Sequence, residues 1–323
     1  KEERSKIALF CNVDEECVFE VKDAETTIYE VPLMFAKSGL AEVVLSKLGM
    51  EPQPLEFDTW RNFVQRIKSP KGEVKIALVG KYAKYRDSYK SIFEAFVHAG
   101  SINNVKVTVD LLNSEEIDDT NSKDIISKYD GVLVGPGFGN RGIEGKIASI
   151  RYCRENKLPF FGICLGMQCA VVEFSRNVCG LPEANSFEFS KTTPHKVIDL
   201  MDDQKKIKEK GGTMRLGAYP CVIKEKTMAF AAYKATEISE RHRHRYEVNN
   251  QYRETLEQHG MVLSGLSPDG HLVEMMELPD HPWFVGCQFH PELKSRAVKG
   301  HPLFISFIKA VLKLKKEKAE VKD

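Results

Sequence analysis

The chain has 323 residues, which corresponds to roughly two domains at about 150 residues each. Its 47 basic and 46 acidic residues nearly cancel, and no apolar run reaches the ~18 residues of a membrane span, so we expect neither a nucleic-acid nor a membrane partner. Eight cysteines without a C-x-x-C pair argue against a disulfide scaffold and a zinc knuckle, and predict no bound metal in a reducing cytoplasm.

The first part of the chain does not predict a core of its own. Residues 1–45 are typical of a strand that starts near Lys6, an acidic loop, a second strand and then one helix. This is too little to bury a core, so we expect the end of a domain that begins before this chain. Residues 46–73 carry proline and glycine on both sides of an amphipathic stretch, which predicts an interdomain linker.

From residue 74 onward, apolar strands alternate with helical periodicity. The predicted strands are 74–80, 105–112, 129–134 and 158–163, and the predicted helices between them are 88–100 and 143–156. This alternation favours a parallel sheet covered on both faces. Later residues are richer in strands up to a final helix at 302–314. The charged stretch 202–212 predicts a mobile surface loop, and 316–323 a charged tail.

One cysteine differs from the other seven. Cys164 lies between a predicted strand and a predicted helix and is flanked by Gly162 and Gly166. G-x-C-x-G in this position is typical of a nucleophile elbow, in which a sharp turn lifts the side chain above the sheet. The helix N-terminus favours a thiolate and an oxyanion. The alternative is a buried structural cysteine.

A thiol nucleophile needs a base with an orienting partner, and the segment after residue 289 offers both. His290 and Glu292 are two residues apart and point the same way in extended chain, so the carboxylate can hold one ring nitrogen while the other faces Cys164. A second oxyanion donor is the N–H of Gly137, in a glycine loop that ends the preceding strand. Such a loop could equally hold phosphate, but no Walker lysine follows it.

The run of arginines and histidines at 241–245 has several readings. His242 and His244 share a face in extended chain, as metal ligands or a basic patch would. Neighbouring arginines repel a cation, so we favour a structural role for the run and a substrate contact for Arg245.

Several segments together resemble a known family. "GICLGMQ" and "CQFHPE" are similar to the triad-type class I glutamine amidotransferases. "GGTMRLG" at 211–217 and "ERHRHRYEVN" at 240–249 resemble the CTP synthase family among them. "SKIALFCNV" and "KDAETTIY" resemble the end of that family's synthetase domain. The family loop reads P-G-G-F-G, whereas Gly135 and Pro136 are swapped here, which leaves the donor on Gly137 in place.

The resemblance implies a fold and a reaction. Residues 74–315 would form a flavodoxin-like α/β domain with a central, mostly parallel sheet, preceded by a remnant of a Rossmann-like amidoligase domain. Cys164 would be the nucleophile, His290 the base and Glu292 its orienter. Glutamine would be hydrolysed, and its ammonia channelled to UTP phosphorylated by ATP to give CTP. This chain alone would act as a glutaminase only.

The resemblance also implies binding residues and partners. The expected glutamine contacts are Gly137, Leu165, Gly166, Met167, Gln168, Glu188 and Arg245. The expected nucleotide contacts are Lys6 for UTP or CTP and Lys22, Asp23 and Ala24 for ATP, and Arg141 and Glu144 would lie near a lid that responds to GTP. Glutamine hydrolysis would need no cofactor. The full-length enzyme would use ATP and Mg²⁺, respond to GTP as allosteric activator and form a homotetramer through its synthetase domain.

Two other functions remain open from the sequence. One is a different triad hydrolase, such as a γ-glutamyl hydrolase, and the other is a catalytically silent fragment. "GGTMRLG" and "RHRHRYEVN" favour the glutamine amidotransferase over a plain hydrolase, and the intact cysteine, histidine and glutamate argue against a silent fragment.

Overall fold

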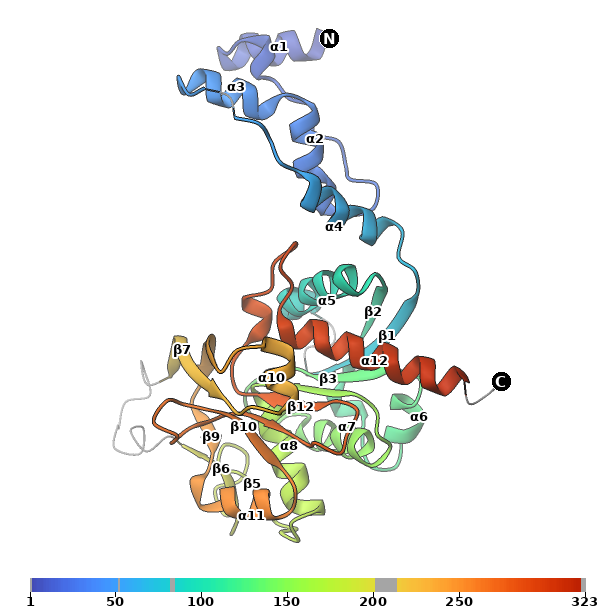
Figure 1. Cartoon of the computed structure of the whole chain (residues 1–323), viewed down its shortest axis with the longest axis vertical. Coiled ribbons are helices and arrows are strands. Elements are labelled where there is room, and N and C mark those ends of the chain that lie inside the picture. Colours follow the sequence, from blue (N-terminus) through green and yellow to red (C-terminus); the bar gives the residue numbers. More distant parts are fainter. Residues whose placement is uncertain (1, 52, 82–84, 201–213, 321–323) are drawn as a thin grey trace. The chain divides into compact units, whose positions relative to one another are not determined.

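The computed structural model describes residues 2–51, 53–81, 85–200 and 214–320. It divides into two compact units, Lys1–Lys71 and Gly72–Asp323 (Figure 1). Among the described residues, no helix combines the length and apolarity needed to cross a bilayer. The loop predicted at 202–212 and the first residues of the 211–217 motif lie outside the described residues.

The first unit is helical, and the two strands predicted in it are wrong. Its elements are α1 (Glu2–Cys11), α2 (Val31–Lys37), α3 (Leu40–Lys47), α4 (Asp58–Lys68) and the short 3₁₀ turns η1 (Glu15–Cys17) and η2 (Ile28–Glu30). The apolar run that begins at Lys6 lies within α1. A helix satisfies its own backbone hydrogen bonds, whereas a strand needs a neighbour, and the described residues of this unit provide no strand to pair with.

Two further predictions for this unit need correction. The single helix predicted after residue 30 is broken into α2 and α3 at Gly39, whose φ of 80° is left-handed. The predicted linker contains α4, which packs on η2. The Trp60 indole N–H donates to the Tyr29 carbonyl at 2.8 Å, and the Phe63 ring meets the Tyr29 ring edge-on at 5.0 Å.

The described residues of the second unit form two sheets. The larger contains β1 (Glu73–Gly80), β2 (Lys106–Asn113), β3 (Gly131–Val134), β4 (Phe160–Ile163), β7 (Arg215–Ile223), β8 (Glu237–His244), β10 (Val262–Leu266), β11 (Val273–Glu277) and β12 (Phe284–Cys287). The smaller contains β5 (Asn185–Ser186), β6 (Lys196–Leu200) and β9 (Tyr246–Val248). The helices are α5 (Lys90–Asn103), α6 (Ser122–Ile126), α7 (Ile143–Glu155), α8 (Leu165–Asn177), α10 (Met228–Tyr233), α11 (Arg253–Gln258) and α12 (Pro302–Glu320), with 3₁₀ turns at η3 (Arg86–Tyr89), η4 (Ser114–Glu116), η5 (Asn250–Tyr252) and η6 (Pro291–Leu293).

The large sheet has the order β2-β1-β3-β4-β12-β11-β10-β7-β8. Its first five strands are parallel, with Leu78 paired to Leu111 on one side and Leu133 on the other. This 2-1-3-4-5 arrangement is the flavodoxin-like order, so the predicted fold is confirmed. From β11 to β8 the sheet continues as antiparallel strands.

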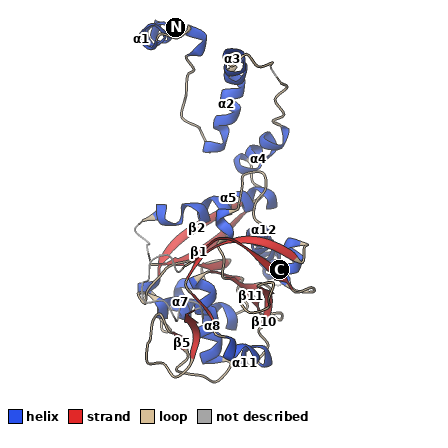
Figure 2. Ribbon diagram, turned by 90° about the vertical axis from the view of Figure 1, so that its left-hand side faces the viewer, coloured by secondary structure: helices blue, strands red, loops and turns tan. Residues whose placement is uncertain are grey.

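Helices cover both faces of the parallel strands (Figures 1 and 2). One core cluster contains residues of α7 and α8, such as Ile147 and Val171, and the other contains residues of α5 and α12. In the second cluster, the rings of Phe96 and Phe304 meet edge-on at 5.1 Å. The predicted charged tail at 316–323 is wrong in part, because α12 continues through Glu320.

Candidate functional site

The carboxyl ends of the parallel strands form one edge of the sheet, and the predicted catalytic residues lie along it. The glycine loop at 135–139 follows β3, Cys164 follows β4, and His290 follows β12. In open α/β sheets, ligands bind outside the carboxyl ends of the strands. Segments that are more than 150 residues apart in the chain therefore meet because β4 lies between β3 and β12.

Cys164 occupies a strained turn between β4 and α8. Its φ of 53° and ψ of −102° are unusual for a residue with a side chain, and strain of this kind is concentrated at functional sites. Both flanking residues must be glycine because a side chain there would collide with neighbouring backbone. A Cβ on Gly166 would lie 2.1 Å from the Val134 carbonyl oxygen, and one on Gly162 would lie 2.8 Å from the Gly166 backbone. The turn can therefore form only without side chains at both positions.

The backbone groups that the sequence predicts as oxyanion donors lie beside this cysteine. No side chain caps α8, so its first-turn N–H groups, starting at Leu165, face the site. The backbone of Gly137 approaches so closely that an added Cβ would lie 3.3 Å from Leu165 Cδ2 and 3.8 Å from Lys146 Nζ. Lys146 is fully buried and donates to the Gly135 carbonyl at 3.0 Å, and burial lowers its pKa to about 8.

His290 and Glu292 form the expected pair. His290 Nδ1 lies 2.7 Å from Glu292 Oε1, and both residues are buried. Burial lowers the pKa of His290, but the adjacent Cys164 sulfur and the Glu292 carboxylate outweigh it and raise the pKa to about 10. The ring therefore carries a proton at neutral pH, which is the form that partners a thiolate and can protonate a leaving amine.

Glu188, which is expected to hold glutamine, lies against the glycine loop. Glu188 Oε1 accepts from the Gly139 N–H at 2.6 Å, so it is tied to the glycine loop. Burial raises the pKa of Glu188, while the Gly139 hydrogen bond and nearby cations, including Arg245, act in the opposite direction. Such a carboxylate is the chemical partner that the ammonium of an amino acid requires.

Gln288 was missed by the sequence analysis. It is fully buried, and its Nε2 donates to Cys164 Sγ at 3.6 Å. Gln168, predicted to contact glutamine, uses its side-chain Nε2 for the Tyr246 carbonyl and for Gln288 Oε1. Its position directly after β12 and two residues before His290 is the signal that could have found it.

The described residues favour no metal site at the histidine run. His242 Nδ1 lies 3.1 Å from the Glu240 carbonyl and its Nε2 lies 2.7 Å from Glu274, so both ring nitrogens have partners. A cluster of metal-ligand type occurs in the first unit at Asp14, Glu16 and Cys17, but it is not enclosed, and Asp14 is already paired with a lysine.

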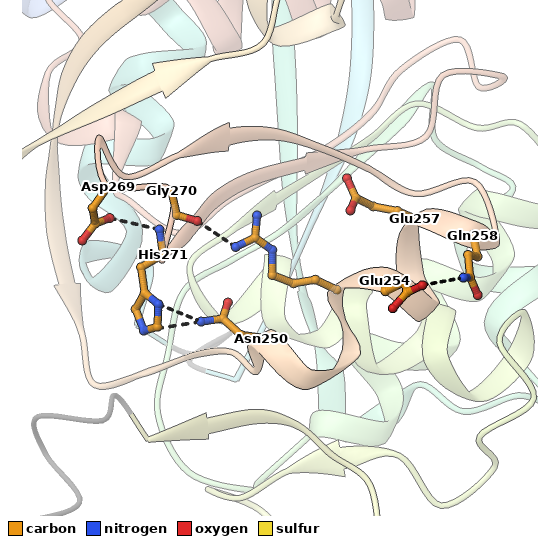
Figure 3. Close-up of a pocket in the computed structure, with 8 residues that line it drawn as sticks. Asn250, Glu254, Glu257, Gln258, Asp269, Gly270 and His271 are labelled. Atoms are coloured by element: carbon orange, nitrogen blue, oxygen red, sulfur yellow. Dashed lines mark hydrogen bonds between the residues drawn. The ribbon is translucent and has the colours of Figure 1, made fainter.

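One hollow in the second unit is lined by predicted catalytic residues, and a larger one is not. A hollow of about 190 Å³ is lined by His290 and Glu292 together with Tyr89, Pro136 and Arg243. A larger, open one of about 830 Å³ lies between η5, α11 and the turn before β11 (Figure 3). Its polar groups bond one another, for example Asn250 with His271, and it contains none of the catalytic residues.

Comparison with known proteins agrees with this geometry. Residues 85–310 match the family model described as glutamine amidotransferase class-I, and residues 1–50 match the one described as CTP synthase N-terminus. The CTP synthase of Chlorobium phaeobacteroides strain BS1 is 57% identical over 314 residues, covering 96% of this chain and 55% of the relative. That of Syntrophus aciditrophicus is 54% identical over 317 residues, covering 98% of this chain and 59% of the relative.

The chain belongs to the CTP synthase family of class I glutamine amidotransferases. A solved structure of the Trypanosoma brucei CTP synthase glutaminase domain, with bound acivicin, aligns with a TM-score of 0.70 and 38% identity. The alignment covers 74% of this chain and 94% of the Trypanosoma brucei domain. The chain spans little more than half the length of the CTP synthases it matches.

All four residues predicted to bind nucleotides are described in the structure and lie in the first unit. Lys6 pairs with Glu2, and Lys22 with Glu20, on exposed parts of the first unit. Asp23 is exposed and Ala24 half-buried, and both follow Lys22 directly. The role of all four stays a prediction.

The predicted GTP lid residues lie at the start of α7. Arg141 Nη2 lies 3.4 Å from the Lys81 carbonyl, and Glu144 pairs with Arg176 at 2.8 Å. Their relation to GTP stays a prediction.

Proposed function

We propose that this chain hydrolyses glutamine to glutamate and ammonia, with Cys164 as nucleophile, His290 as proton carrier and Glu292 as its orienter. The observation that carries the proposal is the thiol at a strained strand-to-helix turn, beside an imidazole that a buried carboxylate holds at 2.7 Å. Sulfur, proton donor and helix N-terminus supply the three functions that acyl transfer requires.

The steps follow from these groups. The Cys164 thiolate attacks the side-chain amide carbon, and the developing oxyanion accepts from the N–H groups of Leu165 and Gly137. The His290 proton goes to the amide nitrogen, which leaves as ammonia. Water then gives a proton to His290 and attacks the thioester, which releases glutamate and restores the thiolate.

Substrate selection would use the charged residues at the end of the site. The Glu188 carboxylate would take the ammonium of glutamine, and Arg245 would pair with its α-carboxylate. Leu165, Gly166, Met167 and Gln168 would line the pocket. The side-chain N–H groups of Gln168 are already used within the protein, which leaves its oxygen for substrate.

In the whole protein, we propose that the ammonia is passed to UTP phosphorylated by ATP, with Mg²⁺, to give CTP in the cytoplasm. Membership of the family and the match of residues 1–50 support this. Lys6, Lys22, Asp23 and Ala24 would form the edge of the nucleotide sites, so no step through ATP or Mg²⁺ is assigned to this chain. GTP would activate the enzyme near Arg141 and Glu144, and the whole enzyme would be a homotetramer.

Glutamate release from glutamine, with and without GTP, tests the proposed function. Cys164→Ala is expected to lose at least about 1,000-fold of the activity, because the nucleophile is removed. Cys11→Ala, at an exposed cysteine of the first unit, serves as the matched control and should keep it. Retained hydrolysis in the Cys164 variant would show that the nucleophile is assigned wrongly.

A diazo-ketone analogue of glutamine separates the alternatives. A single adduct on Cys164 that glutamine blocks would support the glutaminase. Faster hydrolysis of γ-glutamyl peptides than of glutamine would indicate a γ-glutamyl hydrolase instead, and a folded chain without any adduct would indicate a silent fragment.

A further inference from the structure

The Cys164 sulfur accepts a hydrogen bond from a residue outside the predicted Cys–His–Glu set. Gln288 follows β12, whose last residue Cys287 also accepts the Cys164 backbone N–H at 2.7 Å. The Gln288 side chain is fully buried, and its Nε2 lies 3.6 Å from Cys164 Sγ. An N–H···S contact of this kind bears on the nucleophile itself.

The orientation of the Gln288 amide follows from its neighbours. The Tyr246 carbonyl can only accept, so the Gln168 NH₂ group must face it, at 2.8 Å. The second proton of that NH₂ group lies toward Gln288 at 3.1 Å, where it requires an oxygen. The Gln288 NH₂ group must then be at the other end, facing the sulfur. Gln168 is 3% exposed and Gln288 0%, so water does not offer an alternative partner.

This donor discriminates between the two forms of the sulfur. A neutral thiol accepts hydrogen bonds weakly, whereas a thiolate accepts them strongly, so the contact favours the charged form. His290 must give its proton to the leaving nitrogen, but an amide keeps its protons throughout. Gln288 therefore still faces the sulfur when the thioester breaks and the negative charge returns to it.

We propose that Gln288 is a catalytic residue that stabilises the Cys164 thiolate through its side-chain N–H, and that Gln168 is the positioning residue that orients it. This inference rests on the proposed function, because it takes Cys164 to be the nucleophile. It also implies that the reactivity of the Cys164 thiol depends on the Gln168–Gln288 pair as well as on His290 and Glu292.

The test is the rate of Cys164 alkylation by iodoacetamide as a function of pH, followed by tandem mass mapping that separates Cys164 from Cys169. Gln288→Met removes the donor at similar length. We expect the midpoint of its rate–pH profile to move up by about one pH unit, with roughly tenfold slower alkylation at neutral pH and an unchanged plateau at high pH. Gln168→Met should shift the midpoint in the same direction by less.

A second variant, Gln288→Glu, tests the same role if Gln288→Met does not fold. Gln288→Glu keeps the shape and still accepts from Gln168, but it turns a carboxylate oxygen toward the sulfur, so the midpoint should rise further. Gln258→Met, at an exposed glutamine of α11, is the control and should match the parent protein. In glutaminase assays, kcat should fall about tenfold in Gln288→Met, with KM within about twofold.

The outcomes separate this inference from the proposed function. Folded Gln288→Met and Gln288→Glu proteins with the parent alkylation profile would overturn the role of Gln288, whatever the glutaminase activity. If the Gln288 variants have a shifted alkylation profile but the parent protein does not hydrolyse glutamine, the role of Gln288 is supported and the proposed function is contradicted.

Discussion

Glu292 acts on the site through a single hydrogen bond to His290 Nδ1. That bond fixes which ring nitrogen faces the cysteine, and the negative charge favours the protonated ring. In the proposed reaction, the proton that leaves with the ammonia would therefore depend on a residue that does not touch the substrate. The same logic of a buried polar group oriented by its neighbour applies to Gln288.

Glu292→Gln tests this at the residue scale. The amide keeps a hydrogen bond but loses the charge, so we expect kcat for glutamine hydrolysis to fall roughly 100-fold with KM little changed. The pKa of His290 is raised to about 10 partly by Glu292, so the alkaline limb of the parent pH profile should move to lower pH in the variant.

The measurement is kcat/KM between pH 6 and 11. Glu257→Gln, at an exposed glutamate of α11, is the matched control and should follow the parent profile. An alkaline limb that stays in place in Glu292→Gln would mean that His290 does not depend on this carboxylate.

At the scale of elements, the two faces of strand β8 carry different side chains. Arg241 and Arg243 are exposed, while His242 and His244 are buried on the opposite face. Beneath the strand, Glu274 of β11 pairs with both His242 and Arg215 of β7. The arginine–histidine run is therefore an inter-strand network on one face and a solvent-exposed row on the other.

Replacing Glu274 by Gln should destabilise the second unit strongly. The change leaves the buried Arg215 without a counter-charge, and breaking a buried ion pair from one side costs about 3 kcal/mol or more. Urea unfolding measures the difference, with the exposed Glu254→Gln as control. A loss below about 1 kcal/mol would show that the charge of Arg215 is compensated elsewhere.

At the scale of the whole molecule, the second unit buries several histidines in neutral form. Burial lowers the pKa of His98 and His244, and lowers that of His281 to about 4. His281 Nε2 donates to the Cys153 carbonyl at 3.0 Å, and its Nδ1 accepts from the Trp283 N–H at 3.2 Å. This arrangement connects α7 to the start of β12 and requires a neutral ring.

Stability should therefore fall as the pH is lowered from about 6.5 to about 4. In this range the unfolded chain binds a proton at His281 and the folded chain does not, so acid favours unfolding. In His281→Gln the slope of unfolding free energy against pH should be smaller by about 1.4 kcal/mol per pH unit. Equal slopes for variant and parent in urea titrations at pH 4 to 7 would contradict this.

Much of the parallel half of the fold follows from local patterns. The apolar runs of β1, β3 and β4 lead into glycine or Cys164, and helical periodicity separates the strands, so a parallel sheet with the elbow at its edge could be predicted. The G-x-C-x-G spacing predicted the elbow because glycine is sterically required on both sides of the cysteine, as Gly166 and Val134 show. The contact between His290 and Glu292 was predicted, but its geometry was not: Glu292 lies in the 3₁₀ turn η6, not in extended chain, and this turn brings its carboxylate to His290 Nδ1.

The tertiary structure decided what depends on distant partners. The run from Lys6 has no strand neighbour among the described residues, so α1 forms where alternation alone predicted a strand. Gln288 approaches Cys164 only because β12 is inserted beside β4, with 124 residues between the two side chains. Local sequence determines which segments can form strands and turns, but the hydrogen bonds of a buried amide depend on which strands become neighbours.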